Sequence, residues 1–185
     1  MAEPDLLDVL DAALYFDEPS APGVDALLAE AARHYGEPEA EHSLLRAYFL
    51  APEQLGVLVG LYRYYFYQHR LEDALIVAER ALEASARRLE LAGGWRRLNA
   101  VQLGEAAMRS IGLLRFHLLA LKAAAVVQMR LGRLADARAR LAKVLEMDQR
   151  DQLGARGLLT LLDARIAAGA GEIAEETDHE HCQPV

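Results

Sequence analysis

The sequence is poor in the residues that usually signal disulfides, membrane insertion or secretion. Cys182 is its only cysteine, which excludes an internal disulfide. We find no apolar run of the roughly 18 to 20 residues that a transmembrane helix needs. The N-terminal stretch MAEPDLLDVLD lacks the basic and apolar regions of a signal peptide. We therefore expect a cytoplasmic protein with no membrane association.

A basic excess is also missing, because the formal net charge is −8. Nucleic-acid binders need a positively charged footprint, so we expect no nucleic-acid partner. Acidic residues are in excess over residues 1–57 and again in the last fourteen positions, whereas 63–156 is rich in arginine. β-Branched residues are few, while Ala, Leu, Arg and Glu dominate, and this composition predicts an all-α fold.

The stretch from Leu118 to Asp151 has the pattern of two helices folded back on each other. Its turn is predicted at Gly132-Arg133, and small residues mark close helix contacts at Ala124, Ala125 and Ala137. Leu141, Val144 and Leu145 continue the spacing of an amphipathic helix after Ala137.

This stretch resembles a tetratricopeptide repeat, a helix–turn–helix unit of about 34 residues. Gly132 and Ala137 stand where the family has them, whereas Leu121, Gln128 and Gln149 replace the first aromatic residue, the Tyr and the closing Pro. The resemblance implies a solenoid of antiparallel helix pairs, about seven or eight helices here, that binds a partner protein along its concave face.

The same register places further units upstream, since Ala40 and Ala74 are 34 positions apart. From Ala74 to Ala137 the spacing is 63, so about 29 residues are inserted near 89–117. We expect the helix from Leu71 to continue to Leu91 and end at Gly93-Gly94. A second long helix is expected from near Gly104 into the third unit, with a bend at Gly112; together the two make one extended helix pair. The chain is therefore predicted to have three parts: an N-terminal helix (Pro4 to Tyr15) and linker over 1–20, a helical domain over 21–168, and a disordered acidic tail over 169–185. Within the helical domain, the predicted repeat units are 21–54, 55–88 and 118–151, and a capping helix follows over 152–168.

The repeat geometry implies a basic, aromatic groove formed by the first helix of each unit. Such a groove favours an acidic or amphipathic partner segment, through charge-assisted hydrogen bonds. The alternative is that its cations are ordinary solvated side chains. The residues predicted to bind the partner are Arg33, Arg63, Phe66, Tyr67, Lys122, Met129 and Arg130. In the aromatic run, we expect Tyr62 and Tyr65 in the core and at least one of Tyr64 and Tyr67 accessible.

The C-terminal tail offers a weaker candidate metal site. His179, His181 and Cys182 are transition-metal ligand types close together in sequence, although an ordinary acidic tail is the simpler interpretation. Catalysis is not predicted, because no phosphate-binding loop follows a strand and Cys182 has no fixed base nearby. We expect no cofactor.

Three functions remain open: an adaptor or assembly factor that binds one protein partner, an accessory protein that handles a metal or cofactor through the tail, and a self-associating homodimer. The segment from Ala51 to Arg88 also looks like small repeat proteins associated with bacterial nitrogen-fixation gene sets. That resemblance implies a role around nitrogenase maturation or protection, which would favour the second function.

Overall fold

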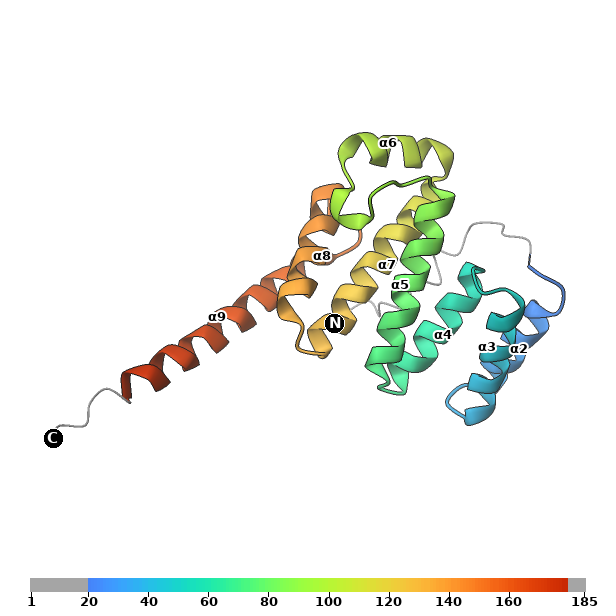
Figure 1. The fold of residues 1–185 in the computed structure, drawn as a ribbon, viewed down its shortest axis with the longest axis horizontal. Coiled ribbons are helices and arrows are strands. Elements are labelled where there is room, and N and C mark those ends of the chain that lie inside the picture. Colours follow the sequence, from blue (N-terminus) through green and yellow to red (C-terminus); the bar gives the residue numbers. More distant parts are fainter. Residues whose placement is uncertain (1–19, 180–185) are drawn as a thin grey trace.

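The computed structural model describes residues 20–179, with side chains as far as residue 168. The predicted helix at 4–15 therefore lies outside the described residues. Within them the chain forms eight α-helices and no strand, so the predicted all-α class is confirmed (Figure 1). The helices are α2 (Val24–Arg33), α3 (Pro38–Leu50), α4 (Leu55–Tyr67), α5 (Leu71–Arg88), α6 (Ala100–Arg109), α7 (Ile111–Arg130), α8 (Leu134–Met147) and α9 (Ala155–His179).

Consecutive helices pack on one another as hairpins: α2 with α3, α4 with α5, and α7 with α8. The second and third hairpins have the same turn. His69 and Gly132 both adopt positive φ, 57° and 75°. The next residue donates its N–H to a carbonyl five positions back, Arg70 to Tyr65 and Arg133 to Gln128, each at 2.9 Å. This bond satisfies a carbonyl at the helix end and turns the chain sharply.

The helix that starts at Leu71 ends earlier than its sequence suggests. We predicted its end at Gly93-Gly94, but α5 ends at Arg88 and Glu90 adopts a φ of 56°. The Leu91 N–H donates to the Ala86 carbonyl at 2.9 Å, which is the same helix end that follows α4 and α7. A non-glycine residue in the left-handed region has replaced the glycine signal on which the prediction relied.

The inserted residues form a detour instead of lengthening α7 as one continuous helix. They contain a short 3₁₀ helix (Trp95–Arg97) and α6, which lies across one end of the neighbouring helices (Figure 1). The predicted bend at Gly112 is wrong, because the break is at Ser110, whose backbone is extended (φ −163°, ψ 107°). The Ser110 hydroxyl accepts a hydrogen bond from the Leu113 N–H at 3.2 Å and so caps α7. Because α5 packs directly on α7, the detour leaves the order of packing intact.

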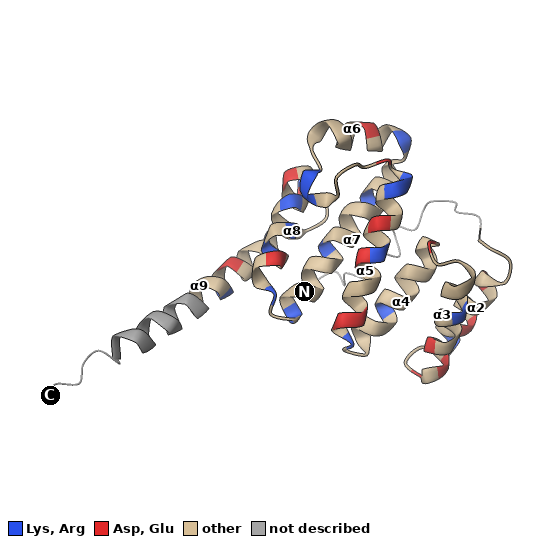
Figure 2. Cartoon of the chain, in the orientation of Figure 1, with Lys and Arg blue, Asp and Glu red and all other residues tan. Residues whose placement is uncertain are grey.

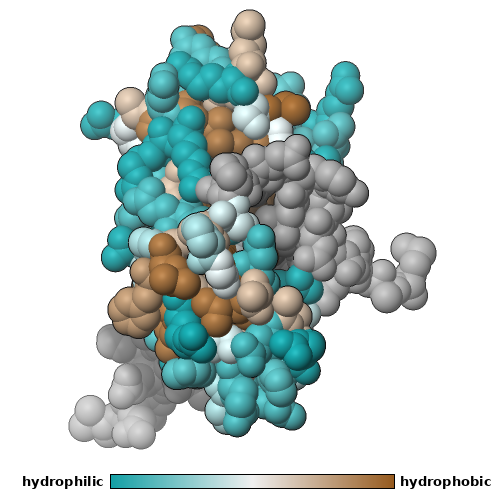
Figure 3. Space-filling model, turned by 90° about the vertical axis from the view of Figure 1, so that its right-hand side faces the viewer, coloured by the Kyte–Doolittle hydropathy of each residue, from teal (hydrophilic) through white to brown (hydrophobic). Residues whose placement is uncertain are grey.

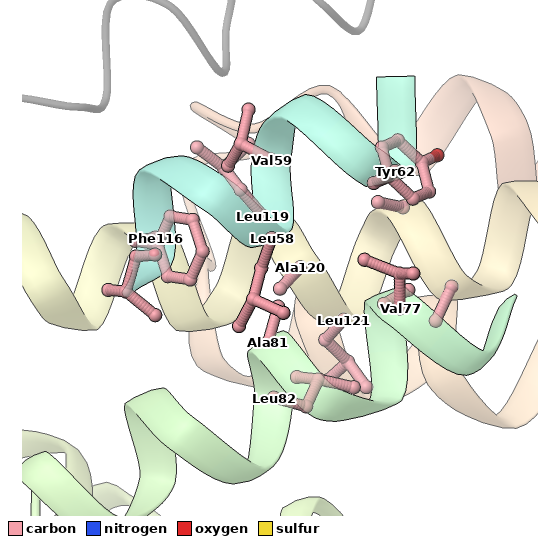
Figure 4. Packing of buried hydrophobic residues seen from close by; sticks show 14 of the residues in the cluster. Leu58, Val59, Tyr62, Val77, Ala81, Leu82, Phe116, Leu119, Ala120 and Leu121 are labelled. Atoms are coloured by element: carbon pink, nitrogen blue, oxygen red, sulfur yellow. The ribbon is translucent and has the colours of Figure 1, made fainter. Parts of the chain in front are cut away.

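One core joins the hairpins, and α4, α5 and α7 form its centre (Figure 4). Phe116 is 1% exposed there, packed among side chains from all three helices. The small residues predicted at close contacts, Ala124, Ala125 and Ala137, are all fully buried. Their lack of bulk is what lets α7 and α8 approach each other.

α7 corrects the statement that no run is long enough to span a membrane. Ile111–Arg130 is long and apolar enough by composition, with a mean hydropathy of 1.5, but 72% of the apolar window is buried inside the fold. This burial is what a core helix shows.

α9 follows α8 and packs on it, with Leu162 fully buried. The helix continues to His179, beyond the predicted end at residue 168 and into the stretch predicted to be disordered. Gly169 and Gly171 weaken a helix by about 1 kcal/mol each without forbidding it, and Ala and Glu around them favour it.

Candidate functional site

An open cavity of about 410 Å³ lies between α2 and α4, with one wall from α3. We call it the α2/α4 groove. Its lining is mostly apolar, and Arg63 supplies the only charged side chain among the described lining residues. The lining residues are Leu28, Ala31, Ala32, Tyr35, Leu44, Gly56, Val59, Gly60 and Arg63. Of the residues predicted to bind a partner, Arg63 lies in this lining.

Two glycines of α4 form the floor of the groove. A Cβ atom at Gly60 would lie 2.8 Å from Cδ2 of Leu44, whereas one at Gly56 would lie 3.8 Å from Cδ1 of Leu28. Gly60 therefore permits the close approach of α3 to α4, and Gly56 stands in ordinary contact distance. The missing side chains also keep the groove open.

An aromatic strip connects the C-terminal ends of α2, α4 and α7. Tyr35 and Tyr67 meet edge to face at 6.0 Å between ring centroids, and Tyr67 meets Phe66 at 6.0 Å. Arg130 then lies over the Phe66 ring, 4.8 Å from its centroid. We define the strip as Tyr35, Tyr67, Phe66 and Arg130. Tyr35 and Tyr67 are 48% and 43% exposed, so a partner can reach them.

The strip and the groove share Tyr35, so they form one continuous surface. Arg33 is exposed at the end of α2, beside this surface in sequence. Figure 2 shows the charges of this part of the molecule, where α2 and α3 also carry acidic side chains. Three of the predicted binding residues, Phe66, Tyr67 and Arg130, lie in the strip, Arg63 lies in the groove, and Met129 is half-buried against the core.

Lys122 does not offer its charge to this surface. It is 7% exposed, and its ammonium donates a hydrogen bond to the Leu153 carbonyl at 2.5 Å. Burial lowers the pKa of Lys122, while the carboxylate of Asp151 opposes that effect. The prediction that Lys122 lines the groove is corrected, because the turn between α8 and α9 folds over its side chain.

The aromatic run of α4 behaves largely as predicted. Tyr62 and Tyr65 are buried and Tyr67 is accessible, although Tyr64 is also buried. The Tyr62 hydroxyl has no hydrogen-bond partner among the described residues. Burial raises the pKa of Tyr62 above its ordinary value, with the nearby Arg130 charge acting in the opposite direction. The hydroxyl therefore stays protonated.

Tyr35, Gly56 and Gly60 are among the surface residues that sequence reasoning missed. Tyr35 follows the last turn of α2 and lies outside the helical pattern from which the groove was predicted. The two glycines had a signal, since Gly56 and Gly60 are one helical turn apart in an apolar stretch, which marks a close helix approach.

Ser85 and His117 form a buried pair with the spacing of a nucleophile and its base, but a substrate cannot reach them. The Ser85 Oγ and His117 Nδ1 atoms are 2.8 Å apart between α5 and α7, and the residues are 0% and 2% exposed. Ser85 also donates to the Ala81 carbonyl at 2.7 Å. Burial lowers the pKa of His117 to about 4. The pair is part of the core, where no substrate reaches it.

Over the described residues, no group of His, Cys, Asp or Glu is arranged to hold a metal ion. The predicted ligands His181 and Cys182 lie outside that part of the chain, and the side chain of His179 does as well. The tail site stays a prediction.

A second cavity, of about 390 Å³, lies between α6, α7 and the turn after α8. It is lined mainly by apolar residues, and Ile111 at its edge is 70% exposed. Unlike the α2/α4 groove, it has no neighbouring aromatic strip among the described residues.

Comparison with known proteins gives one informative match. No family model and no solved structure matches the chain. A protein of Azotobacter chroococcum mcd 1 is 51% identical over 158 residues, which cover 85% of this chain and 88% of the relative. Its description reads "Uncharacterized 19.8 kDa protein in nifW 5'region", which locates its gene in a nitrogen-fixation context.

Proposed function

We propose that this chain, which belongs to the same family as the 19.8 kDa protein of Azotobacter chroococcum, is a non-enzymatic adaptor or assembly factor. In this proposal it binds an acidic, amphipathic segment of another protein in the α2/α4 groove and along the aromatic strip. The relative's gene location supports a role around nitrogenase maturation or protection in the cytoplasm.

The observation that carries the proposal is the continuity of the groove with the strip. The groove has an apolar floor suited to the apolar face of a helix, and Arg63 stands at that floor. The strip adds exposed tyrosines beside Arg130, a composition common in binding hot spots. A partner with an apolar stripe and carboxylates beside it would satisfy both parts.

We also propose that the three hairpins are tetratricopeptide-like units. Support comes from the shared turn geometry of α4–α5 and α7–α8 and from the direct packing of α5 on α7. In such an arrangement α2, α4 and α7 are the first helices of their units, and these three helices carry the aromatic strip.

The test uses a fluorescent helical peptide with leucines on one face and glutamates on the other, and a second peptide with lysines in place of the glutamates. Anisotropy should show that the full chain binds the acidic peptide more tightly, with an affinity that falls as salt rises. Arg33→Glu combined with Arg63→Glu should weaken binding at least about tenfold, because losing a charge-assisted hydrogen bond costs about 1.5 kcal/mol or more.

Two further variants make the result specific to the groove. Arg46→Glu is the matched control, since Arg46 is exposed on α3 and lies outside the lining, and it should bind like the unmodified chain. Ala32→Trp fills the groove from an exposed lining position without changing charge, and it should abolish binding. Equal affinity in the Ala32 and Arg46 variants would refute the groove as the binding site.

A second candidate is an accessory protein that captures a metal or cofactor through the tail, and the relative's gene location favours it. Truncation after Gly171 should then remove binding of Zn²⁺ or Ni²⁺ measured by calorimetry, whereas an unchanged isotherm would exclude the tail.

Self-association is a third candidate, favoured by exposed apolar side chains on α3. Phe49 and Leu50 are 85% and 57% exposed, and Figure 3 shows apolar surface among hydrophilic residues on the side of the molecule where α2 and α3 lie. Light scattering should show a dimer that Phe49→Ser dissociates; a monomer at high concentration would exclude it.

A further inference from the structure

We propose that residues 4–15 of the chain dock in its own α2/α4 groove and compete there with the partner segment. The competition with a partner rests on the proposed function, whereas the docking of residues 4–15 does not depend on any partner. The occupant is thus a named part of this chain, one that precedes the described residues.

The chain enters the described region beside the groove. Gln54 donates from its amide nitrogen to the Ser20 hydroxyl at 2.8 Å, and its amide oxygen lies 3.4 Å from the Ala21 N–H. Gln54 is the residue immediately before α4, and it is 9% exposed. The preceding residues therefore start from the N-terminal ends of the two groove helices.

The N-terminal segment has the chemistry that the groove is proposed to select. Its leucines at positions 6, 10 and 14 recur at the spacing of one helix face. The first nineteen residues contain no Lys or Arg, and their acidic residues are Glu3, Asp5, Asp8, Asp11, Asp17 and Glu18. An apolar stripe would meet the groove floor, and the carboxylates would lie near the long side chains of Arg33 and Arg63.

Length and direction agree with this placement. A helix over residues 4–15 would be about 18 Å long, close to the length of about 20 Å for α4. Residues 16–19 span at most about 14 Å. This short link starts close to the groove, because Ser20 is hydrogen-bonded to Gln54 and Gly56 already belongs to the lining. Since the connection is at the N-terminal end of α4, the segment would run antiparallel to α2 and α4. Asp5 and Asp8 would then come level with Arg63 and Arg33.

Tethering makes weak docking effective. A short linker holds the segment at an effective concentration in the millimolar range, so a segment that would bind at about 100 μM when free would occupy the groove about nine-tenths of the time. The apparent affinity for a competing segment falls by the fraction of open groove, here about tenfold.

The first measurement compares two single variants of the full chain. Leu10→Asp places a charge on the apolar face of the segment, whereas Ala12→Asp adds the same charge on the opposite face. The Leu10 variant should bind the acidic peptide about tenfold more tightly than the unmodified chain, and the Ala12 variant should match the unmodified chain. Equal affinities in all three would overturn the inference.

The second measurement detects docking without any partner. A nitroxide is attached to Ala2→Cys in a Cys182→Ser background, and amide signals are recorded by NMR. Broadening should be stronger at the C-terminal ends of α2 and α4, near Arg33 and Tyr67, than at their N-terminal ends, and Leu10→Asp should remove it. Broadening that is absent or unchanged by Leu10→Asp would overturn the inference.

The two measurements separate the two proposals. If the nitroxide broadens α2 and α4 but no peptide binds, even to the Leu10 variant, docking stands and the adaptor function fails. If the peptide binds in an Arg33- and Arg63-dependent way but Leu10→Asp changes nothing, the adaptor function stands and docking fails.

Discussion

The buried imidazole of His117 should make the fold sensitive to mild acid. Nδ1 faces the Ser85 hydroxyl at 2.8 Å, and Nε2 is buried with no hydrogen-bond partner among the described residues. The network is satisfied when Nδ1 carries the proton and donates to Ser85, which in turn donates to the Ala81 carbonyl. A second proton, on Nε2, would give a buried imidazolium cation whose new N–H has no hydrogen-bond acceptor among the described residues.

The sign and size follow from the pKa of His117, about 4 in the folded chain against 6.5 when exposed. Below pH 6.5 the unfolded chain takes up a proton that the folded chain refuses, so the free energy of unfolding falls as pH decreases and levels off below about pH 4. The loss should reach about 2 kcal/mol between pH 7 and pH 5, and about 3 kcal/mol once both forms are protonated.

Urea unfolding followed by circular dichroism at pH 7, 6 and 5 measures this loss. His117→Gln removes the titrating group and keeps a hydrogen-bonding side chain, so its pH dependence should be flatter than that of the unmodified chain by about 2 kcal/mol over this range. His42→Gln, at an exposed position on α3, is the matched control for replacing a histidine by glutamine. If the His117 variant loses as much stability between pH 7 and pH 5 as the unmodified chain, the account of a buried neutral imidazole is refuted.

Three other substitutions test the fold around the site. Phe116→Ala should lower the free energy of unfolding by about 3 to 5 kcal/mol, measured in urea, because the side chain is fully enclosed between helices. Asn99→Ala should cost about 1 kcal/mol and speed hydrogen exchange in α6 alone, since the side-chain oxygen Oδ1 of Asn99 accepts hydrogen bonds from the N–H groups of Val101 and Gln102 at 3.0 and 3.1 Å and so caps α6; equal acceleration in α7 would contradict this. Lys122→Met should cost about 1.5 to 3 kcal/mol in urea by removing the hydrogen bond to the Leu153 carbonyl, yet leave affinity for the acidic peptide unchanged.

The sequence was informative wherever one local pattern decided the structure. Helical spacing located the hairpins, and the alanines at their contacts are buried because only small side chains fit between close helices. The outcome at α5 differed, because a helix end of this type accepts Glu90 at positive φ as well as glycine. The start of α7 at Ser110 could have been predicted, since a serine before an apolar helix is a common N-cap.

The candidate site was less predictable because it depends on contacts between distant segments. The position of Lys122 on its helix is the one expected of a residue on the concave face of a repeat. It is buried because the turn after α8, 31 residues later in the chain, covers its side chain. Tyr35 joins Tyr67 through the packing of α2 beside α4, which no local pattern contains. Charge and spacing identified the arginines of the surface and two of its aromatic residues, whereas its apolar lining depends on three-dimensional packing.

The detour between α5 and α7 holds the only tryptophan of the chain. Trp95 is half-buried, with the guanidinium carbons of Arg96 and Arg140 at 4.3 and 4.9 Å from its ring. Arg96 belongs to the same 3₁₀ helix, whereas Arg140 belongs to α8, so the Arg140 contact docks Trp95 on α8. The fluorescence of Trp95 therefore reports whether this detour is packed on α8, whereas circular dichroism reports the total helix content of the chain. Two probes that melt together would identify one cooperative unit. Earlier melting of the tryptophan signal would show that the detour opens while the hairpins remain folded.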